Sequence, residues 1–91
     1  MINNLKKISL DFPNDPGIYK FLSDSEILYI GKAKNLKKRI KSYFSGKQTF
    51  KTQKLISFAT NLEYVTTNNE VDALLLEQNL IKSEKPKFNI L

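Results

Sequence analysis

The sequence contains neither cysteine nor histidine. Without cysteine the chain cannot form disulfide bonds or a cysteine-based zinc site, which fits a reducing compartment. Without histidine it cannot use an imidazole as a general base, so acid–base chemistry must come from another residue type. Long apolar runs are also missing, because none approaches the roughly 20 residues of a membrane span and residues 1–7 lack the apolar core of a signal peptide. We therefore expect a cytoplasmic protein.

The chain is short, and its 91 residues are enough for one small domain with a modest core. We find no internal repeat, low-complexity tract or interdomain linker. The sequence is therefore interpreted as a single domain over residues 1–91, in which residues 1–15 form a lead-in that ends at a turn cluster.

Basic residues are concentrated in the middle of the chain. The net charge is +6, and residues 27–62 contain nine Lys or Arg and no Asp or Glu, so all nine acids lie outside this window. A segment of this length with one sign of charge indicates a polyanionic partner. A well-solvated basic surface without a partner is the alternative. A membrane surface fits less well, because the predicted basic helix lacks a broad apolar face.

Two apolar and aromatic runs, at residues 17–22 and 27–31, flank the polar segment 23–26 and predict a β-hairpin. Side chains alternate across a strand, so each run should place three residues on one face. These are Gly17, Tyr19 and Phe21 in the first strand and Ile27, Tyr29 and Gly31 in the second. For Tyr19 and Tyr29 to share a side of the sheet, we expect a loop of three or five residues centred on Ser25, because a two-residue loop would separate them.

The remaining pattern predicts helices around one further strand. A basic helix follows the hairpin over residues 35–45, with Asn35 as its N-cap and Arg39 and Tyr43 at the edge of its buried stripe. The stripe consists of Leu36, Ile40 and Phe44. The other expected elements are a short helix or irregular segment at 2–12, a mobile polar connection at 47–54, a helix at 52–61, a strand at 62–67, and a last helix that starts after Asn68 or Asn69, runs to 84 and is stopped by Pro86. The fold class is α+β, with a small three-stranded antiparallel sheet flanked by helices.

The last helix holds an acid within an apolar arc. At 100° per residue, Glu77 lies in the middle of five apolar side chains. These are Ala73, Leu74, Leu76, Leu80 and Ile81. A carboxylate there should be buried, so it must be protonated, paired with a cation such as Arg39, or bound to a metal ion. The sequence has no second acid in a comparable place, which favours one metal ion over a two-metal cluster.

The hairpin carries two tripeptides, Gly17-Ile18-Tyr19 and Tyr29-Ile30-Gly31, with nine residues between them. This pair resembles the signature of the GIY-YIG nuclease superfamily. Further segments resemble the N-terminal nuclease domains of the UvrC family, at residues 31–34, 73–77, 79–82 and 85–90. The resemblance implies the GIY-YIG fold and a metal-dependent DNA endonuclease with one Mg²⁺ or Mn²⁺ ion, which makes the 3′ incision in bacterial nucleotide excision repair.

The same resemblance implies partners. A member of the UvrC family acts on damaged duplex DNA with UvrB, and with complexes loaded by UvrA, through segments that lie outside this chain. The chain would then be a fragment of a longer protein, monomeric in isolation and weak in binding and cutting DNA alone.

The resemblance also implies the site residues. The active site comprises Tyr19, Tyr29, Lys32, Arg39, Tyr43, Glu77 and Asn89. Glu77 would be the metal ligand, and Gly17 and Gly31 would let the backbone approach the site closely. In and before the basic helix, the lysines expected to face solvent or phosphate are Lys34, Lys37, Lys38 and Lys41.

Tyrosine is the available general base, because histidine is absent. Its ordinary pKa near 10 must fall to about 8, which takes roughly 2.7 kcal/mol of differential stabilisation of the phenolate. Lys32, Arg39 or the water shell of a metal ion would supply it. The sequence leaves open which tyrosine accepts the proton, and we favour Tyr29. Arg39 would hold the scissile phosphate with its planar fork, while Asn89 and Tyr43 would orient phosphate, water or neighbouring side chains.

Two other functions are compatible with these features. A different GIY-YIG nuclease would share the chemistry and cut another target, although small standalone members tend to carry a histidine where this chain has Tyr43. A nucleic-acid-binding module without catalysis would show salt-sensitive affinity and no turnover. The presence of every candidate catalytic residue counts against this second alternative.

Overall fold

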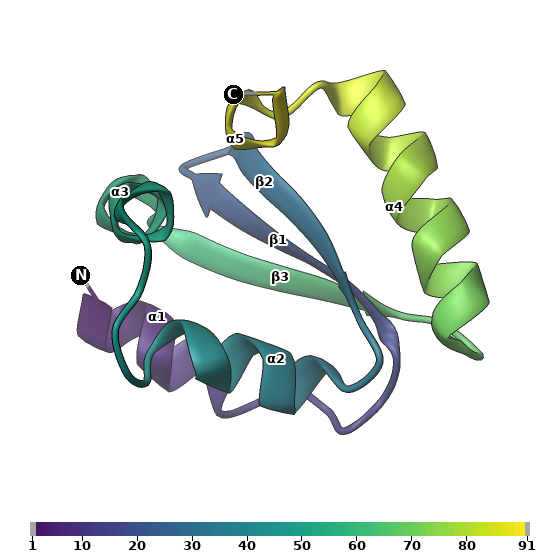
Figure 1. Cartoon of the computed structure of the whole chain (residues 1–91), viewed down its shortest axis with the longest axis horizontal. Coiled ribbons are helices and arrows are strands. Elements are labelled where there is room, and N and C mark those ends of the chain that lie inside the picture. Colours follow the sequence, from purple (N-terminus) through teal and green to yellow (C-terminus); the bar gives the residue numbers. More distant parts are fainter. Residues whose placement is uncertain (1, 91) are drawn as a thin grey trace.

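Three antiparallel strands lie at the centre of the protein, with helices around them (Figure 1). In the computed structural model, which describes residues 2–90, the strands are β1 (Gly17–Ser23), β2 (Glu26–Ala33) and β3 (Asn61–Thr66). Their order is β2-β1-β3, so β1 pairs with both neighbours. The predicted α+β class with a three-stranded antiparallel sheet is confirmed.

Four helices start within two residues of the predicted positions, and a fifth follows Pro86, where no helix was predicted. They are α1 (Ile2–Ser9), α2 (Leu36–Tyr43), α3 (Phe50–Phe58), α4 (Glu70–Glu84) and α5 (Lys87–Ile90). The Asn35 side chain caps α2 by accepting a hydrogen bond from the Lys38 main-chain N–H at 3.0 Å. Asn69 caps α4 in the same way, through the Asp72 N–H at 2.8 Å. None of the helices within residues 2–90 has the length and apolarity that a membrane crossing requires.

The hairpin of β1 and β2 differs from the prediction at its tip. The turn has two residues rather than three or five, with Asp24 at a positive φ of 55°. Pairing is irregular beside it, and Leu28 is left without a partner in the ladder as a β-bulge. The bulge shifts the register by one residue, so Tyr29 still shares a face with Tyr19 although the turn is short. It also moves Ile27 to the opposite face, which corrects the prediction that Ile27 lies on the same face as Tyr29.

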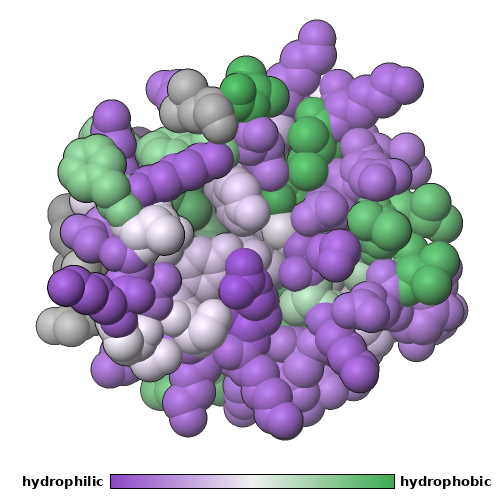
Figure 2. Space-filling model, viewed as in Figure 1, coloured by the Kyte–Doolittle hydropathy of each residue, from purple (hydrophilic) through white to green (hydrophobic). Residues whose placement is uncertain are grey.

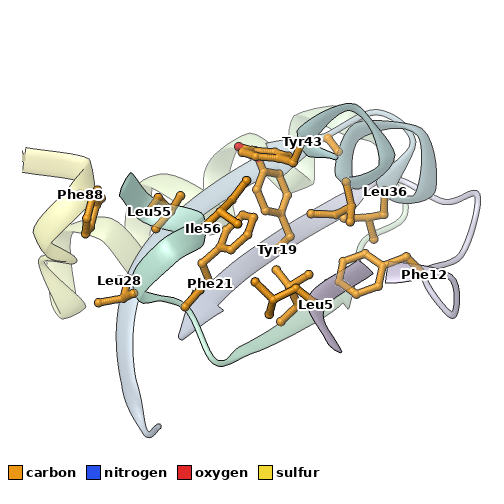
Figure 3. Close-up of a cluster of buried hydrophobic side chains, with 14 residues drawn as sticks. Leu5, Phe12, Tyr19, Phe21, Leu28, Leu36, Tyr43, Leu55, Ile56 and Phe88 are labelled. Atoms are coloured by element: carbon orange, nitrogen blue, oxygen red, sulfur yellow. The ribbon is translucent and has the colours of Figure 1, made fainter. Parts of the chain in front are cut away.

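One face of the sheet carries the main hydrophobic core. Tyr19 and Phe21 project from this face of β1 into a cluster with side chains of α1, α2 and α3 (Figure 3). Other members are Leu5, Phe12, Leu28, Leu36, Leu55, Ile56 and Phe88. The opposite face carries the fully buried side chains of Ile18 and Ile30, and α4 packs against β1 and β2 on that side. The sheet therefore separates α4 from the other long helices.

The buried side of α2 differs from the prediction in one of its three residues. Leu36 and Ile40 are fully buried as expected, but the third buried residue is Tyr43, which is 7% exposed, while Phe44 is only half-buried. The helix ends at Tyr43, so Phe44 leaves the helical stripe as the C-cap residue. Tyr43 therefore belongs to the core, and Arg39 alone lies at the edge of the stripe.

The segment predicted as a mobile connection is a capped helix start. The Thr49 hydroxyl accepts a hydrogen bond from the Thr52 N–H at 3.2 Å, so α3 begins two residues earlier than predicted. The Gln48 side-chain amide donates to the carbonyl oxygens of Ser42 and Ser45, each at 2.7 Å. These contacts tie the start of α3 to the end of α2.

The contact between α4 and the sheet is narrow. Of the 15 residues of α4 only Ala73 is buried, and Val71 and Leu75 are 65% and 54% exposed. Figure 2 shows hydrophobic side chains over this region, at the right of a mostly hydrophilic face. Glu77 is half-buried rather than buried, so the predicted depth of its carboxylate is wrong.

Candidate active site

Four side chains from three elements meet beside the central strand, and we call them the tyrosine–arginine cluster: Tyr19 of β1, Tyr29 of β2, and Arg39 and Tyr43 of α2. The hydroxyls of Tyr19 and Tyr43 share a buried hydrogen bond of 2.6 Å, and Figure 3 shows these two side chains meeting between strand and helix. Arg39 Nε donates to the Tyr19 hydroxyl at 3.3 Å, and the guanidinium carbon lies 5.1 Å from the centre of the Tyr43 ring. The ring centres of Tyr19 and Tyr29 are 6.3 Å apart.

Gly31 leaves the space that the Tyr19 ring occupies. The two residues are partners in the ladder between β1 and β2, and a Cβ atom at Gly31 would lie 2.3 Å from both Cζ and the hydroxyl oxygen of Tyr19. Any larger residue would displace the ring. The close approach predicted at Gly31 is therefore made by the side chain of Tyr19.

Gly17 serves the packing of the fold. A Cβ atom there would lie 2.2 Å from the carbonyl oxygen of Val65 and 2.9 Å from Cδ1 of Leu36. Gly17 thus allows β3 and the first residue of α2 to close on β1. The close approach predicted at this glycine is to neighbouring elements rather than to the tyrosine–arginine cluster.

Asn89 holds the strand that carries Tyr29. Its Oδ1 accepts a hydrogen bond from the Ile30 N–H at 2.8 Å, and its Nδ2 donates to the Ile30 carbonyl at 2.9 Å. Ile30 lies in β2, an edge strand, so Asn89 takes the place of a neighbouring strand at this residue. These contacts are with the main chain, so the predicted orientation of phosphate, water or neighbouring side chains by Asn89 stays a prediction.

Two hydroxyls of the tyrosine–arginine cluster have pKa values above the ordinary value of tyrosine. Burial is the largest cause of a raised pKa at Tyr29, and the charges of Tyr19 and Glu77 add to it. Arg39 and Tyr43 act in the opposite direction without reversing the shift. Burial also raises the pKa of Tyr43 far above its ordinary value, with further contributions from Tyr19. Arg39 thus acts on both hydroxyls in the predicted direction but does not outweigh burial, and the predicted effect of a metal ion's water shell stays a prediction.

Glu77 is the acid that the sequence predicts as a metal ligand. It is half-buried on α4, close enough to Tyr29 for its charge to act there. Within residues 2–90 it forms no ion pair with Arg39, whose guanidinium donates to Tyr19 and lies over the Tyr43 ring. A carboxylate in this situation suits a divalent ion that water and substrate oxygens also ligate. The described part of the chain holds no group of three or more acids, cysteines or histidines that could bind a metal ion.

Lys32 lies apart from the tyrosine–arginine cluster. It follows Gly31 in β2, so it projects from the face that α4 covers, whereas Tyr29 projects from the other face. Its side chain is half-buried and makes no hydrogen bond or ion pair with another residue of the described chain. Lys32 therefore shares its side of the sheet with the helix that carries Glu77.

The four lysines predicted to face DNA do not form one continuous surface. Lys34 and Lys38 are exposed to solvent. Lys37 and Lys41 line a hollow together with Lys6 of α1, on a different side of α2 from the arginine of the cluster. The basic helix thus presents its charges in several directions.

A pocket of about 170 Å³ opens beside the tyrosine–arginine cluster, and Tyr29, Arg39 and Tyr43 line it. The other lining residues are Ser42, Gln48, Lys51, Thr52, Leu55 and Phe88. Three of these come from residues 48–52, a segment predicted to be a mobile connection and outside the site. The signal that could have found them is Thr49, a typical N-cap residue ahead of an apolar-periodic segment.

The sequence matches a family model described as the UvrC-like GIY-YIG domain over residues 15–90, which is most of the chain. The chain belongs to the UvrC-like GIY-YIG domain family. The resemblance carried by the two tripeptides is thereby confirmed. The chain is also similar to the crystal structure of the GIY-YIG N-terminal endonuclease domain of UvrC from Thermotoga maritima bound to its catalytic divalent cation, magnesium. The TM-score is 0.89 at 40% identity, over 97% of this chain and 98% of that chain.

Curated relatives that contain this UvrC-like GIY-YIG domain are much longer than the chain. UvrABC system protein C from Borrelia duttonii is 53% identical over 90 residues, which are 98% of this chain and 15% of that protein. The protein of the same name from Bacteroides fragilis is 51% identical over 89 residues, 96% of this chain and 15% of that protein. The chain therefore spans about 15% of the length of these relatives.

Proposed function

We propose that the chain is a divalent-metal-dependent DNA endonuclease that hydrolyses a phosphodiester bond. The observation that carries this proposal is that Tyr29 and Arg39 line one pocket while the charge of Glu77 acts on Tyr29. Phosphodiester hydrolysis needs a proton acceptor, a phosphate binder and a source of positive charge, and these residues can provide or hold all three. The similar Thermotoga domain, described as an endonuclease with a catalytic divalent cation, supports the proposal.

In this proposal Glu77 holds one Mg²⁺ or Mn²⁺ ion, which when bound would supply positive charge for the phosphate oxygens and for an attacking water. The Arg39 guanidinium binds the scissile phosphate. Its Nε–H is used by the Tyr19 hydroxyl, which leaves the two terminal nitrogens for phosphate oxygens. The buried hydrogen bond between Tyr19 and Tyr43 fixes that hydroxyl, so both tyrosines orient Arg39.

Tyr29 is the proton acceptor in this proposal. It is half-buried and lines the pocket, whereas Tyr19 is buried and hydrogen-bonded to Tyr43. Because its pKa is raised, Tyr29 is a phenol at neutral pH unless positive charge gathers beside it, and Arg39 already acts in that direction. Asn89 positions the strand of Tyr29. Lys32, Lys34, Lys37, Lys38 and Lys41 contribute positive charge towards DNA.

In the cell, the proposed reaction is the 3′ incision of bacterial nucleotide excision repair. The curated relatives of the chain, which are UvrABC system proteins C, support this role. The substrate is then damaged duplex DNA in the cytoplasm. UvrB and complexes loaded by UvrA are the partners, through parts of the longer relatives that this chain does not span. The chain itself acts as one domain, monomeric in isolation.

A chimera tests this proposal. The chain replaces the 90 matching residues of the Borrelia duttonii protein, and the chimera is incubated with UvrA, UvrB, ATP, Mg²⁺ and an end-labelled duplex with one lesion. We expect incision on both sides of the lesion, and loss of only the 3′ cut in the Glu77→Gln variant, with assembly on DNA retained. Glu84→Gln is the matched control, since Glu84 is an exposed acid on the same helix. It should cut as the chimera does.

The opposite results would each contradict one part of the proposal. Full 3′ cutting by the Glu77→Gln chimera would remove Glu77 from catalysis. It would favour a binding module, with the 3′ cut made by a nuclease site elsewhere in the longer protein. Cutting of undamaged DNA by the isolated chain, without any need for UvrB, would favour a GIY-YIG nuclease with another target.

A further inference from the structure

A second concavity, of about 320 Å³, adjoins the pocket of the tyrosine–arginine cluster. The two share Phe88, whose side chain lines both. Figure 3 shows Phe88 at one end of the core together with Leu55, which lines the first pocket, and Leu28, which lines the second. The other residues that line the second concavity are Ser23, Glu26, Lys54, Phe58 and Lys87. A ligand that extends from the first pocket across Phe88 can therefore reach the second.

The ring of Phe58 presents an aromatic surface at this second concavity. Phe58 is 52% exposed, whereas Phe88 beside it is 3% exposed. Their ring centres are 6.3 Å apart and the ring planes are tilted by 58°, so Phe88 supports Phe58 from the core. An aromatic ring that is supported in this way and exposed to solvent can stack against a nucleobase, because every base has a π-face.

The charged residues around Phe58 also suit a nucleotide. Lys54 lies four residues before Phe58, on the same face of α3, and Lys87 reaches the concavity from α5. Neither lysine forms an ion pair within residues 2–90. Glu26 is the only acid among the described residues that line the concavity, and its carboxylate can accept a hydrogen bond from an N–H group of a base. Aromatic and basic side chains at one groove are typical of proteins that bind unpaired DNA.

We propose that the second concavity binds an unpaired nucleobase of the DNA strand that is cut, through stacking on Phe58. This inference rests on the proposed function, in which Arg39 binds the scissile phosphate of that strand. The base must be unpaired, because a base inside a duplex cannot offer its face to a side chain. Lys54 and Lys87 bind the phosphates that flank the base. Phe58 is a substrate-positioning residue and does not touch the reacting atoms.

The test compares two duplexes that differ by one base. One carries a central adenine opposite an abasic residue, and the other carries abasic residues in both strands at that position. Binding is measured in the Glu77→Gln background, which keeps the DNA intact. We expect the first duplex to bind about fivefold or more tightly than the second, and Phe58→Ala to lose this preference. Phe58→Trp, which keeps an aromatic face, should retain the preference, whereas Phe58→Leu, which keeps apolar bulk without such a face, should lose most of it.

Phe50→Ala is the matched control, because Phe50 is an exposed phenylalanine of the same helix that does not line the second concavity. It should keep the preference for the unpaired base. Equal affinity of the Glu77→Gln chain for the two duplexes, or full preference in Phe58→Ala, would overturn the proposal and favour a protein segment as the partner of the exposed ring.

Single-turnover cleavage of the duplex with the unpaired adenine separates this result from failure of the proposed function. Cutting by the unsubstituted chain that is lost in Glu77→Gln would leave the endonuclease standing even if neither duplex were preferred. Absence of cutting, together with a preference that is lost in Phe58→Ala, would overturn the endonuclease and leave a site for an unpaired base.

Discussion

The side-chain amide of Asn89 makes two hydrogen bonds with the main chain of Ile30, a residue 59 positions away in the sequence. Ile30 lies between Tyr29 and Gly31, which are both on the face of the tyrosine–arginine cluster. A side chain of α5 therefore fixes the strand edge that presents Tyr29 to the pocket. We expect Asn89 to influence catalysis through the geometry of β2 rather than through contact with DNA.

Replacing Asn89 by alanine should lower the free energy of unfolding by about 1–3 kcal/mol, because both hydrogen bonds to Ile30 are lost. Chemical denaturation measures this change, and NMR amide resonances of β2 should shift. Single-turnover cleavage should slow while DNA affinity is unchanged. Asn79→Ala, at an exposed position of α4, should stay within about 0.5 kcal/mol of the unsubstituted chain. Unchanged β2 resonances in Asn89→Ala would contradict the positioning role.

Replacing Gly31 by alanine should displace the Tyr19 side chain from its place in the tyrosine–arginine cluster. Its Cβ atom would lie 2.3 Å from two atoms of the buried Tyr19 side chain, which is hydrogen-bonded to Tyr43 and Arg39. We expect a loss of about 1–3 kcal/mol in unfolding free energy and at least a tenfold slower cleavage. Gly46→Ala is the control, since that Cβ would meet open space and only its positive φ of 68° opposes alanine. It should cost about 1–2 kcal/mol and leave the cleavage rate unchanged. Normal cleavage by Gly31→Ala would show that Tyr19 need not be held in this place.

The buried hydroxyl of Tyr43 should make stability depend on pH in the alkaline range. Burial raises its pKa in the folded state above the ordinary value near 10, so above pH 10 the unfolded chain loses this proton while the folded chain keeps it. The contribution of this proton to the free energy of unfolding is therefore complete below pH 10. Above pH 10 that free energy falls by up to about 1.4 kcal/mol per pH unit. Tyr43→Phe lacks this term, and at pH 8 it should be about 1 kcal/mol less stable because the hydrogen bond to Tyr19 is lost. Denaturation of both proteins from pH 8 to 11 should show the difference closing. Parallel curves would be inconsistent with a buried, protonated Tyr43.

Removal of the charge of Glu77 should weaken metal binding without unfolding the chain. Because Glu77 forms no ion pair with Arg39, Glu77→Gln should change the unfolding free energy by no more than about 0.5 kcal/mol in the absence of metal. Calorimetric titration with Mn²⁺ should show at least tenfold weaker binding, and added Mg²⁺ should no longer raise the melting temperature. Glu84→Gln should retain both responses. Equal Mn²⁺ affinity in the two variants would place the metal ion elsewhere.

Local sequence signals were sufficient for most element starts. Asn35 and Asn69 cap the helices that the sequence assigned to them, because an Asn side chain three residues before a free N–H satisfies it whatever the tertiary context. The shared face of Tyr19 and Tyr29 was also predictable, since both belong to apolar runs that must bury one side.

The sequence could not reveal how that shared face is reached. Parity allows either an odd loop or a two-residue turn with one bulged residue, and Leu28 is an ordinary apolar strand residue with no local mark of a bulge. The prediction for Glu77 failed for a related reason. A helical wheel gives the direction of an apolar arc but not the width of the contact, and α4 fully buries only Ala73.

The direction of the tyrosine pKa shifts also depends on tertiary structure. The sequence shows cations near Tyr29 and Tyr43, which would lower a pKa by charge alone. The packing of β1, β2 and α2 buries the Tyr43 side chain and half-buries that of Tyr29, and loss of hydration outweighs the effect of Arg39.

The narrow contact between α4 and the sheet affects the order in which the parts of the site unfold. The tyrosine–arginine cluster lies in the main core, whereas Glu77 lies on a helix of 15 residues held to the sheet by one fully buried side chain. Local opening costs least where few apolar contacts are broken, so we expect α4 to detach before the sheet unfolds. Native-state hydrogen exchange should then show α4 amides exchanging through a low-energy opening while those of β1 exchange only on global unfolding. Equal opening free energies for α4 and β1 would mean that Glu77 and the tyrosines leave their native positions in the same unfolding step.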